Sequence, residues 1–249
     1  MARSSRAAID DARDICAAAL GFDPHGIVFT SGGTESDNLA IHGACGAQGR
    51  AICPETEHHA VLYPVEANNG RLIKVTETGD LDLEHFESLL DLDLSVISVM
   101  LVNNESGRII DLEPIADLRD RYAPQALLHT DAVQAVGKIP VNVKELDVDL
   151  LSISSHKLHG PKGIGALYIK DGVKIDPMIL GGGQEFRLRS GTENLTYATS
   201  LAFVSGFIDG SDSKPLRCSS LPWFIDSNKS RSLFNISLLF ILKPFFIKK

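Results

Sequence analysis

Metal-binding spacings are missing from this sequence. Its four cysteines (Cys16, Cys45, Cys53 and Cys218) form no C-x-x-C pair, and its eight histidines include no H-E-x-x-H pattern. Zinc and iron–sulfur sites need ligands at such spacings, so we expect neither a resident metal nor a disulfide framework. Scattered cysteines of this kind favour a reducing, cytoplasmic location.

Excess positive charge and long apolar runs are missing as well. The formal net charge is −8 and the isoelectric point is near 5.5, which argues against nucleic acid or an anionic membrane as the main partner. The first residues have no apolar core of a signal peptide. Residues 233–242 are about half of the roughly 20 apolar residues that span a bilayer. With no G-x-x-x-x-G-K-[ST] motif, a Walker-type nucleotide site is not expected.

What is present is an alternation of short apolar strands and helical patterns. At 249 residues and 44% hydrophobic content, the chain can bury a sizeable core. Strands are predicted at 26–30, 51–53, 72–75, 95–102, 126–130, 149–154 and 165–170, and helices at 4–20, 82–90 and 112–122, with a small-residue helix after 31–34. This order indicates an α/β fold with a mostly parallel sheet covered on both faces.

Polar clusters follow five of the predicted strands. They lie at residues 31–34, 58, 103–105, 131–134 and 154–157. Ligands of such sheets bind beyond the carboxyl ends of the strands, so we expect these clusters to form one site.

Two of the clusters suggest binding of an anion and covalent chemistry. Ser31-Gly-Gly-Thr34 is a glycine-rich turn entering a helix, where free N–H groups bind anions, although an ordinary turn has the same pattern. Lys157 directly follows a buried strand and stands between His156 and a Gly/Pro-rich turn. Its amine could form a Schiff base there; the alternative is a solvated lysine opening a loop.

The remaining clusters suit a planar heteroaromatic ligand. Asp131 could hold the protonated ring nitrogen of a pyridine cofactor, or cap a helix, and Gln134 could donate to a ring oxygen. His58 could stack on the ring and exchange protons, or merely be hydrogen-bonded. The Asn103–Asn104 amides could serve a phenolate oxygen or a carboxylate, or form a polar turn.

Residues 181–194 read as a mobile, glycine-rich loop carrying Arg187, Arg189 and Thr192. These groups suit capture of a phosphate or carboxylate, with a surface turn as the alternative. After residue 210 the composition changes: residues 211–249 contain no Gly, Ala or Val but eight Ser, and seven Lys/Arg against two Asp. We therefore divide the chain into a large domain, 1–210, and an unrelated low-complexity tail, 211–249.

Together, these blocks resemble one family. They are TSGGTESDN (30–38), TEH (56–58), VNNE (102–105) with Gly107, HTDAVQ (129–134), SHK (155–157) with GPKG (160–163), and GGGQE (181–185) with RSGTEN (189–194). The chain resembles the pyridoxal 5'-phosphate (PLP)-dependent cysteine desulfurases of the NifS/IscS type, which have the class V aminotransferase fold, and the related selenocysteine lyases.

The resemblance implies a role for each block. Lys157 matches the Schiff-base lysine, Asp131 the partner of the pyridinium nitrogen and His58 the ring-stacking base. Cofactor-binding positions are matched by Gly33, Thr34, Asn104, Gln134, Ser154, His156 and Thr192, of which Thr192 would reach the phosphate of the neighbouring subunit in a homodimer. The implied fold is PLP-dependent transferase fold type I, with a seven-stranded large domain and a small domain built from both chain ends.

The resemblance also implies a reaction and its partners. L-Cysteine would give L-alanine and an enzyme persulfide, whose sulfur passes to an acceptor such as an iron–sulfur scaffold protein. The family's N-terminal segment, catalytic-cysteine loop and later substrate-binding arginine have no counterpart here, and the small domain is expected to be largely missing. Cys218 lies too early for the nucleophile, and Cys16, Cys45 and Cys53 read as structural. We expect a truncated desulfurase with little turnover.

Three alternatives stay open. A selenocysteine lyase shares the GGGQE and GTEN blocks. A non-catalytic fragment, or a dimerisation partner of an intact desulfurase, would keep the fold without turnover. An ordinary aminotransferase is disfavoured by the Ser-His-Lys and Arg-Ser-Gly-Thr blocks.

Overall fold

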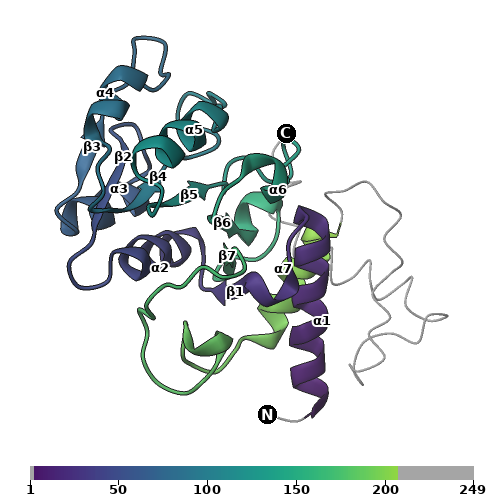
Figure 1. Ribbon diagram of the computed structural model, residues 1–249. Coiled ribbons are helices and arrows are strands. Elements are labelled where there is room, and N and C mark those ends of the chain that lie inside the picture. The colour runs from purple at the N-terminus through teal and green to yellow at the C-terminus, as the bar shows by residue number, and fades with distance from the viewer. Residues whose placement is uncertain (1–2, 207–249) are drawn as a thin grey trace, which may run out of the picture.

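The computed structural model describes residues 3–206, which form one seven-stranded sheet with helices on both faces (Figure 1). The strand order is β1-β7-β6-β5-β4-β2-β3. The strands are β1 (Ile27–Thr30), β2 (Arg50–Pro54), β3 (Arg71–Ile73), β4 (Leu94–Ser98), β5 (Leu127–Asp131), β6 (Leu150–Ser154) and β7 (Gly165–Ile169). All seven predicted strands are confirmed.

One strand opposes the direction of the other six. β7 pairs antiparallel with both β6 and β1, whereas the pairs β2–β3, β2–β4, β4–β5 and β5–β6 are parallel. β1 therefore runs in the same direction as β6. The carboxyl ends of six strands share one edge of the sheet, which confirms the expected mostly parallel architecture.

Helices cover the sheet on two sides. They are α1 (Arg3–Leu20), α2 (Gly33–Cys45), α3 (His59–Ala67), α4 (Leu83–Leu89), α5 (Glu113–Tyr122), α6 (Val143–Leu146) and α7 (Leu195–Ser205). Side chains of α2 and α3 pack with one set of strand residues, including Val28, while α1, α4, α5 and α7 pack with the alternate set, including Ile27 and Phe29. This alternation along β1 is the pattern of a strand buried on both faces.

The structure departs from the expected elements in a few places. Helices α3, α6 and α7 were not predicted, and β4 ends at Ser98 instead of residue 102. The predicted extension still follows β5, because the N–H groups of Val99 and Leu101 donate to the carbonyls of His129 and Asp131. The predicted tail, 211–249, lies outside the described residues. Between residues 3 and 206, no helix is long and apolar enough to cross a membrane.

Candidate functional site

A cavity of about 470 Å³ opens at the shared carboxyl edge of the strands. Nine predicted site residues line it: Gly33, Thr34, His58, Asn104, Asp131, Gln134, Ser154, His156 and Lys157. They come from the ends of β1, β2, β4, β5 and β6, as the sheet geometry predicts. Thr192 is exposed and does not line this cavity. Its contact with the phosphate of a neighbouring subunit therefore stays a prediction.

The turn between β1 and α2 forms one wall of the cavity. Gly32 caps α2 with φ 155°, a backbone conformation that favours glycine, and it supplies no side-chain cap. Thr30 and Ser36 hydroxyls donate to the Gly32 carbonyl at 3.1 and 3.2 Å. The first N–H groups of a helix have no intrahelical partner and point along its positive end, so this turn can bind an anion.

The lysine and two further polar side chains line the cavity at the end of β6. Lys157 lies in the 3-10 turn η2 (Ser155–Leu158) directly after β6 and is half-buried. Within residues 3–206 its amine forms no hydrogen bond or ion pair, so it is available to a ligand. The Ser154 hydroxyl lies 2.8 Å from His156 Nδ1. Burial and the charges of Lys157 and Lys162 lower the pKa of His156.

Asp131 ends β5 and is almost fully buried at the base of the cavity. Its Oδ1 accepts the Val133 N–H at 2.8 Å. Burial raises the pKa of Asp131, and the nearby charges of His58 and Lys157 oppose that rise only in part. A second buried acid, Asp37 of α2, also lines the cavity; sequence reasoning did not single it out.

Two amide side chains and one histidine are oriented by local contacts. Lys138 Nζ donates to Gln134 Oε1 at 2.7 Å, which leaves the amide N–H group of Gln134 for another acceptor. Asn103 Oδ1 accepts three bonds from Glu105 and Ser106, so Asn103 builds the turn that carries Asn104. His58 caps α3, its Nδ1 accepting the Ala60 N–H at 3.1 Å.

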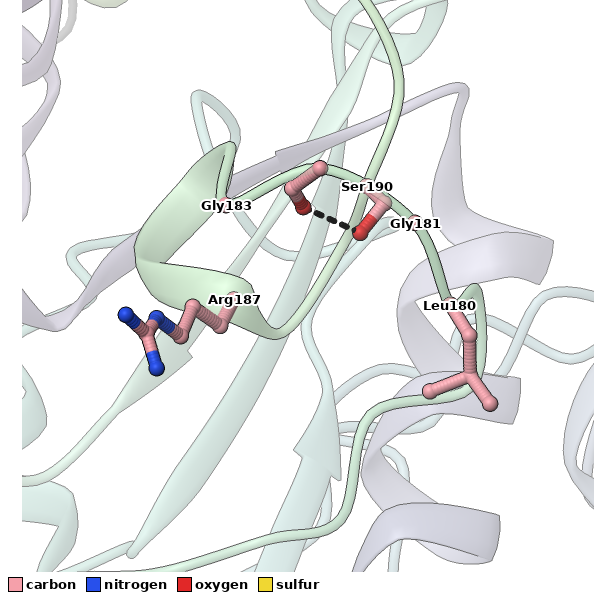
Figure 2. Close-up of a pocket in the computed structure, with 6 residues that line it drawn as sticks. Leu180, Gly181, Gly183, Arg187 and Ser190 are labelled. Atoms are coloured by element: carbon pink, nitrogen blue, oxygen red, sulfur yellow. Dashed lines mark hydrogen bonds between the residues drawn. The ribbon is translucent and has the colours of Figure 1, made fainter.

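The loop predicted to be mobile is tied down at two points. Arg189 Nε donates to Glu35 Oε1 at 2.7 Å, beside the anion-binding turn, and Glu185 is buried against Arg13. Arg189 is therefore not free to capture a ligand. Arg187 is exposed and lines a separate hollow with Gly181–Gly183 and Ser190, whose hydroxyl donates to the Gly182 carbonyl at 2.6 Å; Figure 2 shows Arg187 pointing away from that bond.

The cysteines of the described chain are structural, as predicted. Cys16, Cys45 and Cys53 are buried and line neither hollow. Burial raises the pKa of the Cys16 thiol to about 12 and that of Cys45 to about 11. Such thiols are poor nucleophiles. Cys218 lies outside the described residues.

The geometry defines an α/β protein with a polar cavity at the carboxyl ends of its strands, where a lysine amine and a buried carboxyl line the same space. A family profile described as "Aminotransferase class-V" matches residues 1–206. The chain belongs to the aminotransferase class-V family, whose members are PLP-dependent.

Curated relatives point to one branch of that family. The chain is 46% identical over 202 residues to cysteine desulfurase IscS of Dictyoglomus turgidum, covering 78% of this chain and 51% of that protein. It is 44% identical to cysteine desulfurase IscS of Methanosarcina thermophila, covering 78% and 50%. The chain thus spans about half the length of the curated relatives it matches.

Solved structures agree with these matches. A NifS-like protein from Rickettsia africae superposes with a TM-score of 0.77 at 35% identity, covering 85% of this chain and 60% of that one. SspA in complex with cysteine superposes with a TM-score of 0.76 at 34% identity, covering 82% and 61%. The seven-stranded sheet is that of PLP-dependent transferase fold type I.

Proposed function

We propose that the cavity binds PLP and that this chain is the cofactor-binding part of a cysteine desulfurase. The observation that carries the proposal is the meeting of three groups in one cavity: the Lys157 amine, the buried Asp131 carboxyl and the uncapped turn at Gly33. They suit the aldehyde, ring nitrogen and phosphate of the cofactor. When bound, PLP supplies an electron sink for the substrate's α-carbon.

The phosphate end would be held by the anion-binding wall. Thr34, Ser154 and His156 are the proposed side-chain ligands, with backbone N–H groups at Gly33. In a homodimer Thr192 would add a hydroxyl to the partner's phosphate. The pinned loop that carries Thr192 supports this role, because Arg189 fixes it to Glu35 of α2.

The ring would be held by Asp131 from its nitrogen and by His58 from its face. Gln134 offers its amide N–H group to the phenolic oxygen because Lys138 occupies the amide oxygen, and Asn104 also lines the cavity. Lys157 or His58 would take the proton from the substrate's α-carbon.

We propose L-cysteine as the substrate, with alanine as the product and sulfur passed through a persulfide to an acceptor protein such as an iron–sulfur scaffold. The names of the relatives and the cysteine complex of SspA support this choice. Among residues 3–206 no cysteine lines the cavity. This chain alone is therefore expected to show little desulfurase turnover.

The test is visible absorption of the 249-residue chain titrated with PLP, beside the variants Lys157→Ala and Lys144→Ala. Lys144 lies on α6 and does not line the cavity. We expect a cofactor band in the wild type and in Lys144→Ala that is lost in Lys157→Ala and shifts when L-cysteine is added. A folded wild type without the band, or a band that survives in Lys157→Ala, would contradict the proposal.

A further inference from the structure

Three buried carboxyl groups gather beneath the cavity. Asp37 of α2, Glu57 after β2 and Asp131 at the end of β5 are 1%, 5% and 8% exposed. Asp37 and Asp131 line the cavity, whereas Glu57 does not. In the part of the chain that the structure describes, no lysine or arginine forms an ion pair with any of the three. Because no cation is paired with these carboxyl groups, ionising any of them in the protein interior is costly.

The hydrogen bonds of the cluster are incomplete. Asp131 Oδ1 accepts the Val133 N–H, and Glu57 Oε1 accepts the Met100 N–H. Glu57 Oε2 and Asp37 Oδ1 are buried without a hydrogen-bond partner. A buried acceptor left without a partner is destabilising, and of these two acids only Asp37 lines the cavity, where a ligand could compensate it.

The nearest base does not supply the missing positive charge. His129 Nε2 lies 3.7 Å from Asp37 Oδ1. Both ring nitrogens of His129 are held by serine hydroxyls, Nδ1 by Ser98 at 2.8 Å and Nε2 by Ser152 at 2.9 Å. Burial lowers the pKa of His129 to about 3, so the imidazole is neutral.

Burial raises the pKa of all three acids, and repulsion from a neighbouring carboxyl adds to that rise for Asp37 and Glu57. Burial and the charges of Asp131 and Glu57 raise the pKa of Asp37 well above its usual value, although the Ser152 hydroxyl opposes the rise. Burial and Asp131 likewise raise the pKa of Glu57. Asp131 also faces His58 and Lys157, whose positive charges act on it from the cavity walls. The cluster therefore favours any cation that enters the cavity.

We propose that Asp37 is a second acidic residue of the ring site and, with Asp131, supplies the negative charge that holds a cationic aromatic ring in the cavity. Asp37 carries a proton while the cavity holds no cation and releases it to water when the ring binds. The inference rests on the proposed function for the identity of the ring. The acidity of Asp37 itself does not depend on that identity.

The first measurement needs no cofactor. Urea unfolding of the wild type, Asp37→Asn and Asp117→Asn is followed between pH 5 and pH 8; Asp117 is an exposed carboxylate on α5. A folded pKa above the unfolded value gives stability that is full at low pH and is lost as the pH rises through the folded pKa. We expect Asp37→Asn to gain stability relative to the wild type as pH rises, and Asp117→Asn to run parallel to the wild type. A parallel curve for Asp37→Asn would overturn the proposal.

The second measurement compares PLP with an analogue whose ring nitrogen is replaced by carbon. Removing one of two acidic groups near a cation should weaken PLP binding about tenfold in Asp37→Asn and leave binding of the neutral-ring analogue unchanged. Equal loss for both ligands would mean that Asp37 only shapes the cavity and would overturn the proposal. If the wild type binds the analogue but not PLP, the ring-charge role fails. If the wild type binds neither ligand, the proposed function fails as well. The unfolding curves still show whether the pKa of Asp37 is raised in the folded protein.

Discussion

Arg13 and Glu185 form a buried two-pronged ion pair across 172 residues of sequence. Arg13 Nη1 and Nη2 each lie 2.9 Å from a carboxylate oxygen of Glu185, and the Phe29 N–H donates to the same carboxylate at 2.7 Å. The Arg13 guanidinium also lies between the rings of Phe29 and Phe186. Glu185, Phe186 and Arg187 all have left-handed backbone angles, which persist only where surrounding contacts hold them.

Replacing Glu185 with Gln should therefore destabilise the protein strongly. The substitution leaves the Arg13 guanidinium buried without its counter-charge, and breaking a buried pair in this way costs about 3–5 kcal/mol. The measurement is the free energy of unfolding in urea. Asp10→Asn is the control, because it breaks the exposed Arg6–Asp10 pair on the same helix, a type of pair worth about 0–1 kcal/mol. Equal losses for the two variants would contradict the prediction.

The sheet and the gathering of the site could be predicted because both follow from local pattern. Apolar strands with polar ends predict a shared edge, and nine residues meet there. Helix α7 has a pattern in the sequence that indicates a helix: Asn194 Oδ1 accepts the Tyr197 N–H as an N-cap, and the buried residues Ala198, Leu201, Ala202 and Ser205 repeat at helical spacing. Helix α3 was hidden by Pro64 in its interior.

Other features could not have been predicted from local sequence. The pairs Arg13–Glu185 and Glu35–Arg189 join segments 172 and 154 residues apart, and no periodicity encodes such contacts. They convert a glycine-rich stretch that looks mobile into a fixed loop. The charge state of the cavity base likewise depends on Asp37, Glu57 and Asp131 coming together in three dimensions.

Gly165→Ala should disturb the anion-binding turn and the sheet together. A Cβ at this position would lie 2.6 Å from the Ile153 carbonyl oxygen and 2.8 Å from backbone atoms of Gly32. Backbone cannot rotate away as a side chain can, so we expect a loss of about 1–3 kcal/mol in unfolding free energy and weaker PLP binding. Gly183→Ala is the control, because its Cβ would approach only the Arg187 side chain, at 3.8 Å. A stable Gly165→Ala with unchanged affinity would show that β7 and the turn are less closely packed.

The buried, neutral imidazole of His129 should lower the free energy of unfolding as the pH falls. Its imidazole is fully buried and its pKa is lowered to about 3 by that burial, against 6.5 in an unfolded chain. Below pH 6.5 the unfolded state binds a proton that the folded state refuses, so stability falls as the pH falls through this window. Each pH unit corresponds to about 1.4 kcal/mol, or about 2 kcal/mol between pH 6.5 and pH 5.

The measurement is urea unfolding of the wild type and His129→Gln at pH 7 and pH 5, with His25→Gln as the control. The side chain of His25 is 89% exposed, so this variant controls for the loss of a histidine that is not buried. His129→Gln lacks the titrating ring, and we expect it to lose about 2 kcal/mol less than the wild type on acidification. Because Gln can still bond to the hydroxyls of Ser98 and Ser152, the variant keeps the polar contacts across the sheet while losing the charge change. An acid loss equal to that of the wild type would mean that His129 becomes protonated in the folded state and could then serve Asp37 as a counter-charge.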